Sequence, residues 1–199
     1  MGNIIFGINF VSIKKRINMK LFMYLLGLSV LFSACKSSKE IQLEDTSEKK
    51  MTLEEKKEDN FLITKKIEIF PNKKIELKKD GTGKIYTVFS KGDKVVFIIK
   101  KSQSIDPPMP DGHLEYTLTF ETGNPLKKST WEDEELQEIH AVFGFHAFHP
   151  ESGYYPLKKG KITLIPDAKK KVIKIEVDVK HKYADEINGT YEIPLEEKQ

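Results

Sequence analysis

Cysteine is almost absent from the sequence, because Cys35 is the only one in 199 residues. A single cysteine forms no disulfide within the chain, and zinc sites made of several thiolates need more sulfur than this. Arginine is equally scarce, since Arg16 is the only one and every other base is lysine. Bidentate recognition of carboxylates, phosphates and guanine edges depends on the planar guanidinium group. The sequence therefore argues against folds stabilised by disulfides and against arginine-based binding of nucleic acids.

Long hydrophobic runs are also missing. The longest, residues 21–32, spans 12 residues, whereas a membrane-spanning helix takes about 20. Four basic residues precede this run and two small residues follow it, directly before Cys35. Positive charge, a short apolar run and small residues in this order are typical of a signal peptide, and a buried core helix is the alternative. The basic residues are Lys14, Lys15, Arg16 and Lys20, and the small ones are Ser33 and Ala34.

The stretch 21–36, LFMYLLGLSVLFSACK, resembles the signal peptide of bacterial lipoproteins, which ends in a small residue and a lipidated cysteine. The resemblance implies a lipid on Cys35, which becomes the mature N-terminus and anchors the protein to a membrane. Phe32 departs from the family pattern, in which leucine is usual at that place. Lys36 stands where the signal for inner-membrane retention has aspartate, so the resemblance favours the outer membrane. A cleaved ordinary signal peptide and an uncleaved anchor are the alternatives.

Three segments are expected: a signal peptide over 1–34, with Met19 as an alternative start; a lipidated N-terminus and charged tether over 35–60; and one globular domain over 61–199. Removal of residues 1–34 discards four bases and no acids, which leaves 29 lysines and 30 acids. A nearly neutral chain lacks the positive excess on which nucleic-acid binding depends. We therefore expect no nucleic-acid partner.

The expected tether is rich in charge and poor in apolar residues. Residues 36–60 include six lysines, eight acids and no aromatic residue. Such a composition cannot bury enough apolar surface to fold and predicts a solvated spacer. Within it, 51–59 could form a helical turn or two, with Thr52 as cap and Glu55 three places later.

The expected domain is rich in alternating apolar and polar residues, and all 15 aromatic residues after residue 34 lie between Phe61 and Tyr191. Period-two alternation predicts strands, here eight or nine in an all-β, mainly antiparallel sandwich or barrel. A hairpin turn is expected at 91–93, between the runs 85–89 and 95–99. One short helix is expected over 131–138, capped by Ser129 or Thr130.

Histidines and acids are the first candidates for chemistry. His140, His146 and His149 lie close in sequence, but in one regular strand His140 and His146 would be about 20 Å apart. We therefore expect no metal site there. A cluster of acidic residues could attract calcium. It lacks the glycine and the ligand spacing of a known calcium-binding loop. The start of a helix favours negative charge, which accounts for most of the cluster. This cluster consists of Glu132, Asp133, Glu134, Glu135 and Glu138.

Two loops have binding character. The proline-rich stretch 104–113 includes Asp111 and His113, and stiff loops lose little entropy on docking. The motif GYYP places Tyr154 and Tyr155 at an expected turn, where exposed aromatic rings can stack on sugars or proteins. Ordinary loop architecture is the alternative for both.

None of the common catalytic motifs is present, including GxSxG, GxxxxGK[ST] and GxGxxG after a strand. This absence favours a non-enzymatic envelope module that binds a protein, glycan or small ligand, and no cofactor is expected. An envelope hydrolase with an unrecognised carboxylate pair and a structural subunit of an envelope complex are the alternatives.

Overall fold

The computed structural model describes residues 41, 43, 48–58, 60–105 and 112–195. They belong to one compact unit, Lys39–Gln199. Within the described residues lie ten strands and two short 3-10 helices. They are β1 (Lys49–Glu58), β2 (Phe61–Lys79), β3 (Ile85–Ile105), β4 (His113–Gly123), β5 (Ser129–Glu132), η1 (Asp133–Gln137), β6 (Val142–His146), β7 (Gly153–Pro156), β8 (Gly160–Asp167), β9 (Val172–Val179), η2 (Ala184–Glu186) and β10 (Gly189–Pro194).

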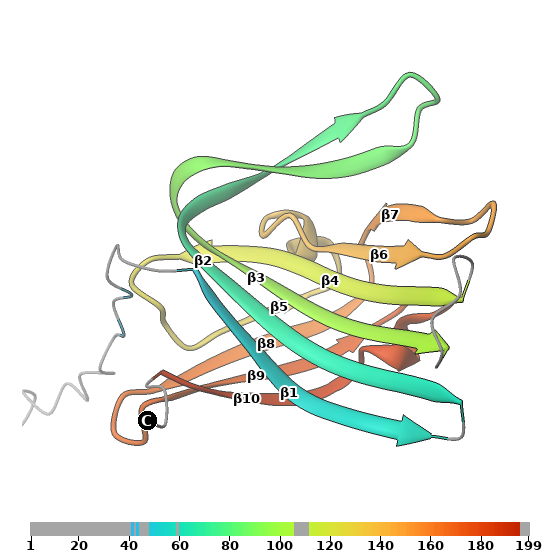
Figure 1. Ribbon diagram of the computed structural model, residues 1–199. Helices are drawn as coiled ribbons and strands as arrows, with labels where there is room; N and C mark the ends of the chain where they lie inside the picture. Colours follow the sequence, from blue (N-terminus) through green and yellow to red (C-terminus); the bar gives the residue numbers. More distant parts are fainter. Residues whose placement is uncertain (1–40, 42, 44–47, 59, 106–111, 196–199) are drawn as a thin grey trace, which may run out of the picture. The chain divides into compact units, whose positions relative to one another are not determined.

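The strands form two antiparallel sheets (Figure 1). One has six strands in the order β1-β2-β3-β4-β6-β7, and the other has four in the order β10-β9-β8-β5. The prediction of an all-β, antiparallel domain is confirmed, and the sheets are separate rather than joined in a closed barrel. Among the described residues, no helix has the length and apolar character that crossing a membrane requires.

A shared hydrophobic core joins the sheets, and it consists of the inward-facing residues that alternate along each strand. Phe97, Phe120 and Phe143 of the larger sheet are fully buried, as are Ile162 and Ile175 of the smaller one. The rings of Phe97 and Phe120 stack 5.2 Å apart. Since side chains point to opposite faces at every step of a strand, the period-two pattern gives each sheet one face toward this core. On β3 the opposite face is buried as well, at Val96 and Ile98.

The hairpin of β2 and β3 has a different turn from the one expected. Residues 91–93 lie inside β3, so the prediction of a turn there is wrong. The chain turns instead at 80–84, where the Asp80 carboxylate accepts hydrogen bonds from the backbone of Thr82 at 2.8 Å and Lys84 at 2.9 Å. At 91–94 the register shifts, because Lys73 faces both Lys91 and Lys94. A bulge of this kind bends the strands without ending them.

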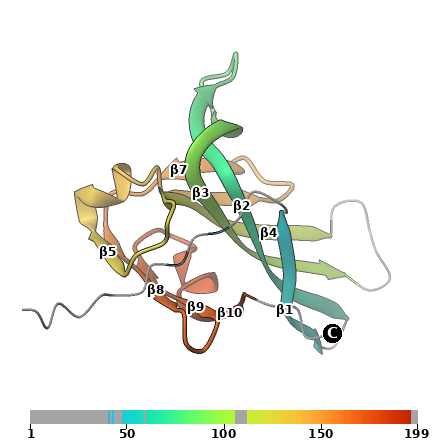
Figure 2. The same ribbon diagram turned by 90° about the vertical axis from the view of Figure 1, so that its left-hand side faces the viewer.

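Beyond this bulge the hairpin continues as a projection, residues 72–94, which we call the arm (Figure 2). At its base, Ile75 and Phe89 pack with Phe70, Val96 and Ile98 in a second hydrophobic cluster. At its tip, the Lys84 ammonium donates to the Ser152 carbonyl between β6 and β7, at 3.1 Å.

A buried carboxylate fixes the base of the arm to the larger sheet. Glu121 of β4, only 5% exposed, accepts a hydrogen bond from the backbone N–H of Ile75 at 2.6 Å. Its other oxygen lies 2.9 Å from Nδ1 of His140. The carboxylate thus connects the arm, β4 and the segment before β6.

The expectation of a solvated spacer over 35–60 is wrong for the described part of that stretch. Residues 49–58 form β1, which pairs with β2, and the helical turns considered for 51–59 do not form. Alternate residues Met51 and Leu53 pack against the core, while Thr52 between them and the charged residues 54–58 are exposed at the sheet edge. Further upstream, Ile41 is 9% exposed and forms a bridge with Leu126.

The expected helix over 131–138 is also wrong in extent and type. Residues 129–132 form β5, and η1 is a five-residue 3-10 helix. Trp131 packs against the core from β5, and the buried Leu136 fixes η1. Glu132, rather than Ser129 or Thr130, precedes the helix as its cap.

Candidate functional site

The loop between β6 and β7 carries the most unusual side chain among the described residues. Phe148 is 86% exposed, whereas the other exposed large hydrophobic side chains in the described part are 37–39% exposed. Displaying a whole phenyl ring to water forgoes about 1.5–3 kcal/mol of burial free energy. A single exposed apolar side chain is ordinary on a protein surface, so the candidate contact point here rests on the way the loop around Phe148 is held.

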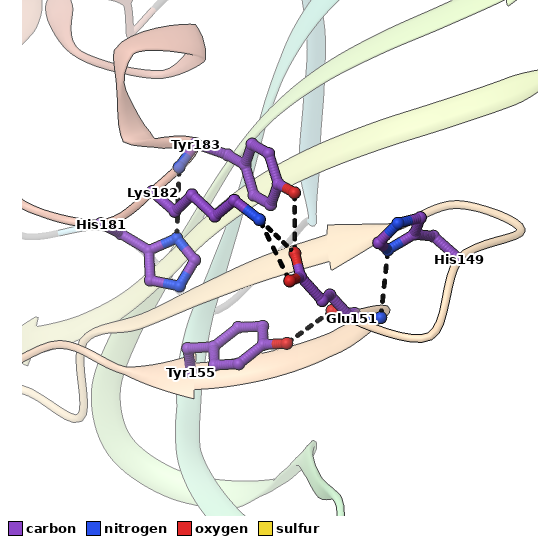
Figure 3. Close-up of polar contacts among 6 residues, drawn as sticks. All are labelled: His149, Glu151, Tyr155, His181, Lys182 and Tyr183. Carbon is purple, nitrogen blue, oxygen red and sulfur yellow. Dashed lines mark hydrogen bonds and ion pairs between the residues drawn. The ribbon is translucent and has the colours of Figure 1, made fainter.

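Polar contacts fix this loop to the segment that follows β9 (Figure 3). The Glu151 carboxylate accepts hydrogen bonds from the Lys182 ammonium at 2.8 and 3.0 Å and from the Tyr183 hydroxyl at 2.7 Å. The Tyr155 hydroxyl donates to the Glu151 carbonyl at 2.5 Å, and the Glu151 N–H donates to Nδ1 of His149 at 3.2 Å. These bonds join the loop, next to its exposed phenyl ring, to β7 and to the segment after β9.

The same contacts stabilise the charged forms of the pair. Hydrogen bonds from Lys182 and Tyr183 lower the pKa of the Glu151 carboxyl below its usual value. The hydrogen bond to Glu151 raises the pKa of the Lys182 ammonium well above its usual value. Both groups therefore keep their charges across the physiological pH range.

Aromatic rings support the loop from the core side. Phe145 stacks on Tyr183 with ring centroids 4.5 Å apart. The centroid of the His181 ring lies 4.5 Å from that of Phe143 and 4.8 Å from that of Tyr155. Burial lowers the pKa of His181 below its usual value, which favours a neutral imidazole among these rings.

We call this group the loop site. It combines an exposed apolar tip, a rigid aromatic base and a rim of opposite charges that satisfy each other. The Glu151 carboxylate is engaged by a cation and a hydroxyl, an arrangement better suited to holding a loop than to transferring protons. The loop site consists of Phe148, His149, Glu151, Tyr155, His181, Lys182 and Tyr183.

The residues singled out from sequence lie in separate places. Tyr155 belongs to the loop site, but both tyrosines lie in β7 rather than in a turn. Tyr154 contacts the His146 ring, with centroids 4.7 Å apart, and His113 is exposed at the start of β4. Two further candidates, Asp111 and Cys35, lie outside the described residues.

The three clustered histidines have different partners. His140 precedes β6 with a positive φ of 48° and contacts Glu121, so 140–146 is not the single regular strand assumed from sequence. His146 packs on Tyr154, and His149 lies in the loop site. In the part of the chain that the structure describes, no group of three or more His, Cys, Asp or Glu residues is placed to hold a metal ion.

The acidic cluster takes part in local structure. The Glu135 carboxylate accepts from the Glu132 N–H at 3.0 Å, at the start of η1. The Asp133 carboxylate accepts from the Gly160 N–H at 2.9 Å, and Glu132 pairs with Lys161 at 2.5 Å. These contacts give the cluster a structural role between η1 and β8.

Sequence reasoning missed most of the loop site. Phe148 had a detectable signal, because Phe143, Phe145 and Ala147 share one face and Phe148 breaks their period. Lys182 and Tyr183 had none, since they meet Glu151 only through the tertiary fold. Comparison of the chain with protein-family models, curated protein sequences and solved structures finds no match.

Proposed function

We propose that the chain is a lipid-anchored protein of the bacterial envelope, without enzymatic activity, whose β-sandwich binds a partner protein through the loop site. The observation that supports this function is the 86% exposure of Phe148 on a loop that Glu151 fixes in place. The lipid anchor rests on the resemblance of residues 21–36 to a lipoprotein signal peptide.

A protein suits this site better than a glycan. A phenyl ring has no polar atom to orient sugar hydroxyls, and its main gain comes from burial in an apolar pocket. Protein interfaces commonly have an aromatic anchor at the centre with a polar rim around it. At the loop site, Phe148 would be that anchor, and Glu151 and Lys182 would belong to the rim.

The loop is also prepared for binding before the partner arrives. Its hydrogen bonds to Lys182, Tyr183 and Tyr155 already restrict its conformations. Ordering a mobile side chain at an interface costs about 0.5–1.5 kcal/mol. A loop that is fixed in the free protein avoids much of this cost.

The binding function can be tested by crosslinking in bacterial cells that express the full chain. Phe148 is replaced by benzoylphenylalanine, and Lys169, exposed in the turn after β8, is replaced in the same way as a control. We expect a discrete protein adduct at 148 and none at 169. Loosening the loop with Lys182→Ala and Tyr183→Phe should reduce the adduct by about tenfold. Adducts with lipid or glycan only, equal adducts at both positions, or an adduct that the loosened loop leaves unchanged would refute a protein-binding loop.

The anchor is tested separately by incorporation of labelled palmitate into the full chain. We expect the original chain to incorporate the label and the Cys35→Ser variant to incorporate none. Label that persists in the serine variant, or no label in either chain, would refute the lipid anchor and leave the crosslinking test unaffected.

A further inference from the structure

Charge is distributed very unevenly between the arm and the rest of the chain. Residues 72–94 include seven lysines and three acids, a net charge of +4. The rest of the chain after residue 34 has 22 lysines and 27 acids, a net charge of −5. The nearly neutral total therefore conceals a basic projection on an acidic body, a pattern typical of binding to an anionic surface. The arm lysines are Lys73, Lys74, Lys78, Lys79, Lys84, Lys91 and Lys94.

The arm projects from the rest of the fold (Figures 1 and 2). Its outer part is exposed and has apolar residues among its lysines. Leu77 is 37% exposed and Tyr86 is 39% exposed. Because Tyr86 pairs with Lys78, Leu77 and Tyr86 point to opposite faces of the hairpin. Apolar groups on both faces are poorly suited to one protein surface. They suit entry into a lipid interface, where tyrosine and leucine settle at the headgroup level and lysines reach anionic groups.

The arm base lies beside the point at which the N-terminal part of the chain joins the fold. Lys94, at the end of the arm, pairs with Gly123 of β4. Three residues later, Leu126 forms the bridge with Ile41. From Cys35 to Ile41 the chain spans at most about 20 Å even when fully extended. A lipid on Cys35 would therefore hold this end of the fold close to the membrane surface.

The arm leaves the fold at this same end, and its tip contacts the loop between β6 and β7 through Lys84 and Ser152. Residues 73–80 of one strand extend over about 25 Å at the usual rise of a β-strand. The strands are continuous with the core sheet, and Glu121 fixes the base. The arm therefore projects as a supported hairpin rather than as a free loop.

We propose that the arm binds the anionic lipid headgroups of the membrane to which the chain is anchored. This inference rests on the lipid anchor of the proposed function and does not require that the loop site bind a protein. Lysines near an anionic membrane contribute about 1 kcal/mol each, so several on one hairpin are enough for a stable contact. An acidic protein as the partner is the outcome that the test must exclude.

The test uses the full lipidated chain in vesicles and a fluorescent amino acid at Thr82, in the exposed turn of the arm. Contact is measured as quenching by lipids that carry a quencher on the headgroup. We expect quenching in vesicles that contain phosphatidylglycerol, little in vesicles of phosphatidylcholine alone, and reversal in about 1 M salt, where the screening length is about 3 Å. Equal quenching in both kinds of vesicle would overturn the inference.

Lysine variants test whether the lysines of the arm cause the quenching. Replacement of Lys78, Lys79 and Lys91 by glutamine should reduce the bound-to-free ratio of the arm in phosphatidylglycerol vesicles by roughly 100-fold. The matched control replaces three exposed lysines of other loops by glutamine and should leave quenching unchanged. These control positions are Lys158, Lys169 and Lys170.

The outcomes separate the two proposals. A chain that incorporates palmitate but shows no quenching in phosphatidylglycerol vesicles overturns the arm inference and leaves the anchor intact. Equal losses in the arm variant and the control would attribute binding to overall charge and also overturn it. Quenching that needs an added acidic protein would identify a protein as the partner, and absence of palmitate would refute the anchor alone.

Discussion

Replacing Glu121 with alanine should release the base of the arm while leaving the sandwich core folded. The Glu121 carboxylate is buried and is the acceptor for the Ile75 N–H at 2.6 Å and for Nδ1 of His140 at 2.9 Å. Alanine removes both contacts and leaves the Ile75 N–H without this acceptor inside the hairpin. Glutamine in the same place keeps one carbonyl oxygen for Ile75 but loses the charge.

The magnitude follows from the burial of each partner. A hydrogen bond to a charged group contributes about 1.5–3 kcal/mol, and the buried contact to Ile75 belongs in that range. The His140 side chain is 46% exposed, so its contact contributes less, about 0.5–1 kcal/mol. We expect Glu121→Ala to lower the free energy of unfolding by about 3 kcal/mol and Glu121→Gln by about 1 kcal/mol.

Urea unfolding of residues 39–199 measures these losses, and amide hydrogen exchange locates them. Exchange should accelerate at residues 73–79 and stay slow in β8 and β9, because the arm opens without the core. The reasoning would be refuted by an alanine variant within about 0.5 kcal/mol of the original chain. It would also be refuted by exchange that accelerates equally in the arm and in the core strands.

Three other predictions concern single residues. Gly144→Ala would place a Cβ 2.2 Å from Oγ1 of Thr117, so we expect urea unfolding to show a loss of about 1–3 kcal/mol, partly restored by Thr117→Ala. Burial raises the pKa of Tyr191 to about 12. The folded state therefore keeps a proton that the unfolded state loses, and stability should fall by up to about 2.7 kcal/mol as pH rises from about 10 to 12, a fall that Tyr191→Phe removes. Burial lowers the pKa of His181 below 6.5, so the unfolded state binds a proton at a higher pH than the folded state does. The free energy of unfolding should therefore fall as pH drops below about 6.5. The fall should be less steep in His181→Phe.

Much of the fold could be predicted from the sequence, because strand burial follows period two. The runs around Phe120 and Ile175 alternate as a sandwich core requires, and both residues are buried. The continuous apolar run 95–99 is buried on both faces, because the second hydrophobic cluster covers its outer side. The prediction of a hairpin turn at 91–93 was wrong because Lys-Gly-Asp also suits a bulge inside a long strand. Strand β1 was not predicted because its many charged residues obscure the alternation of Met51 and Leu53. The strand forms by pairing with β2, which its own sequence does not indicate.

The loop site could be predicted only in part. Tyr155 was found through its local sequence, and Phe148 had a local signal in the broken alternation. The contacts of Glu151 with Lys182 and Tyr183 join residues about thirty positions apart. No local pattern encodes such a pairing, because it depends on how the two sheets bring β7 and the end of β9 together.

The bridge between Ile41 and Leu126 has a mechanical consequence. Its two backbone hydrogen bonds, 3.2 and 2.7 Å long, fasten the N-terminal side of the domain to the segment after β4. In a chain held by a lipid at Cys35, any pull between membrane and domain would load these bonds first and β1 only after they break. The bridge would then be the point at which the attachment fails first under load.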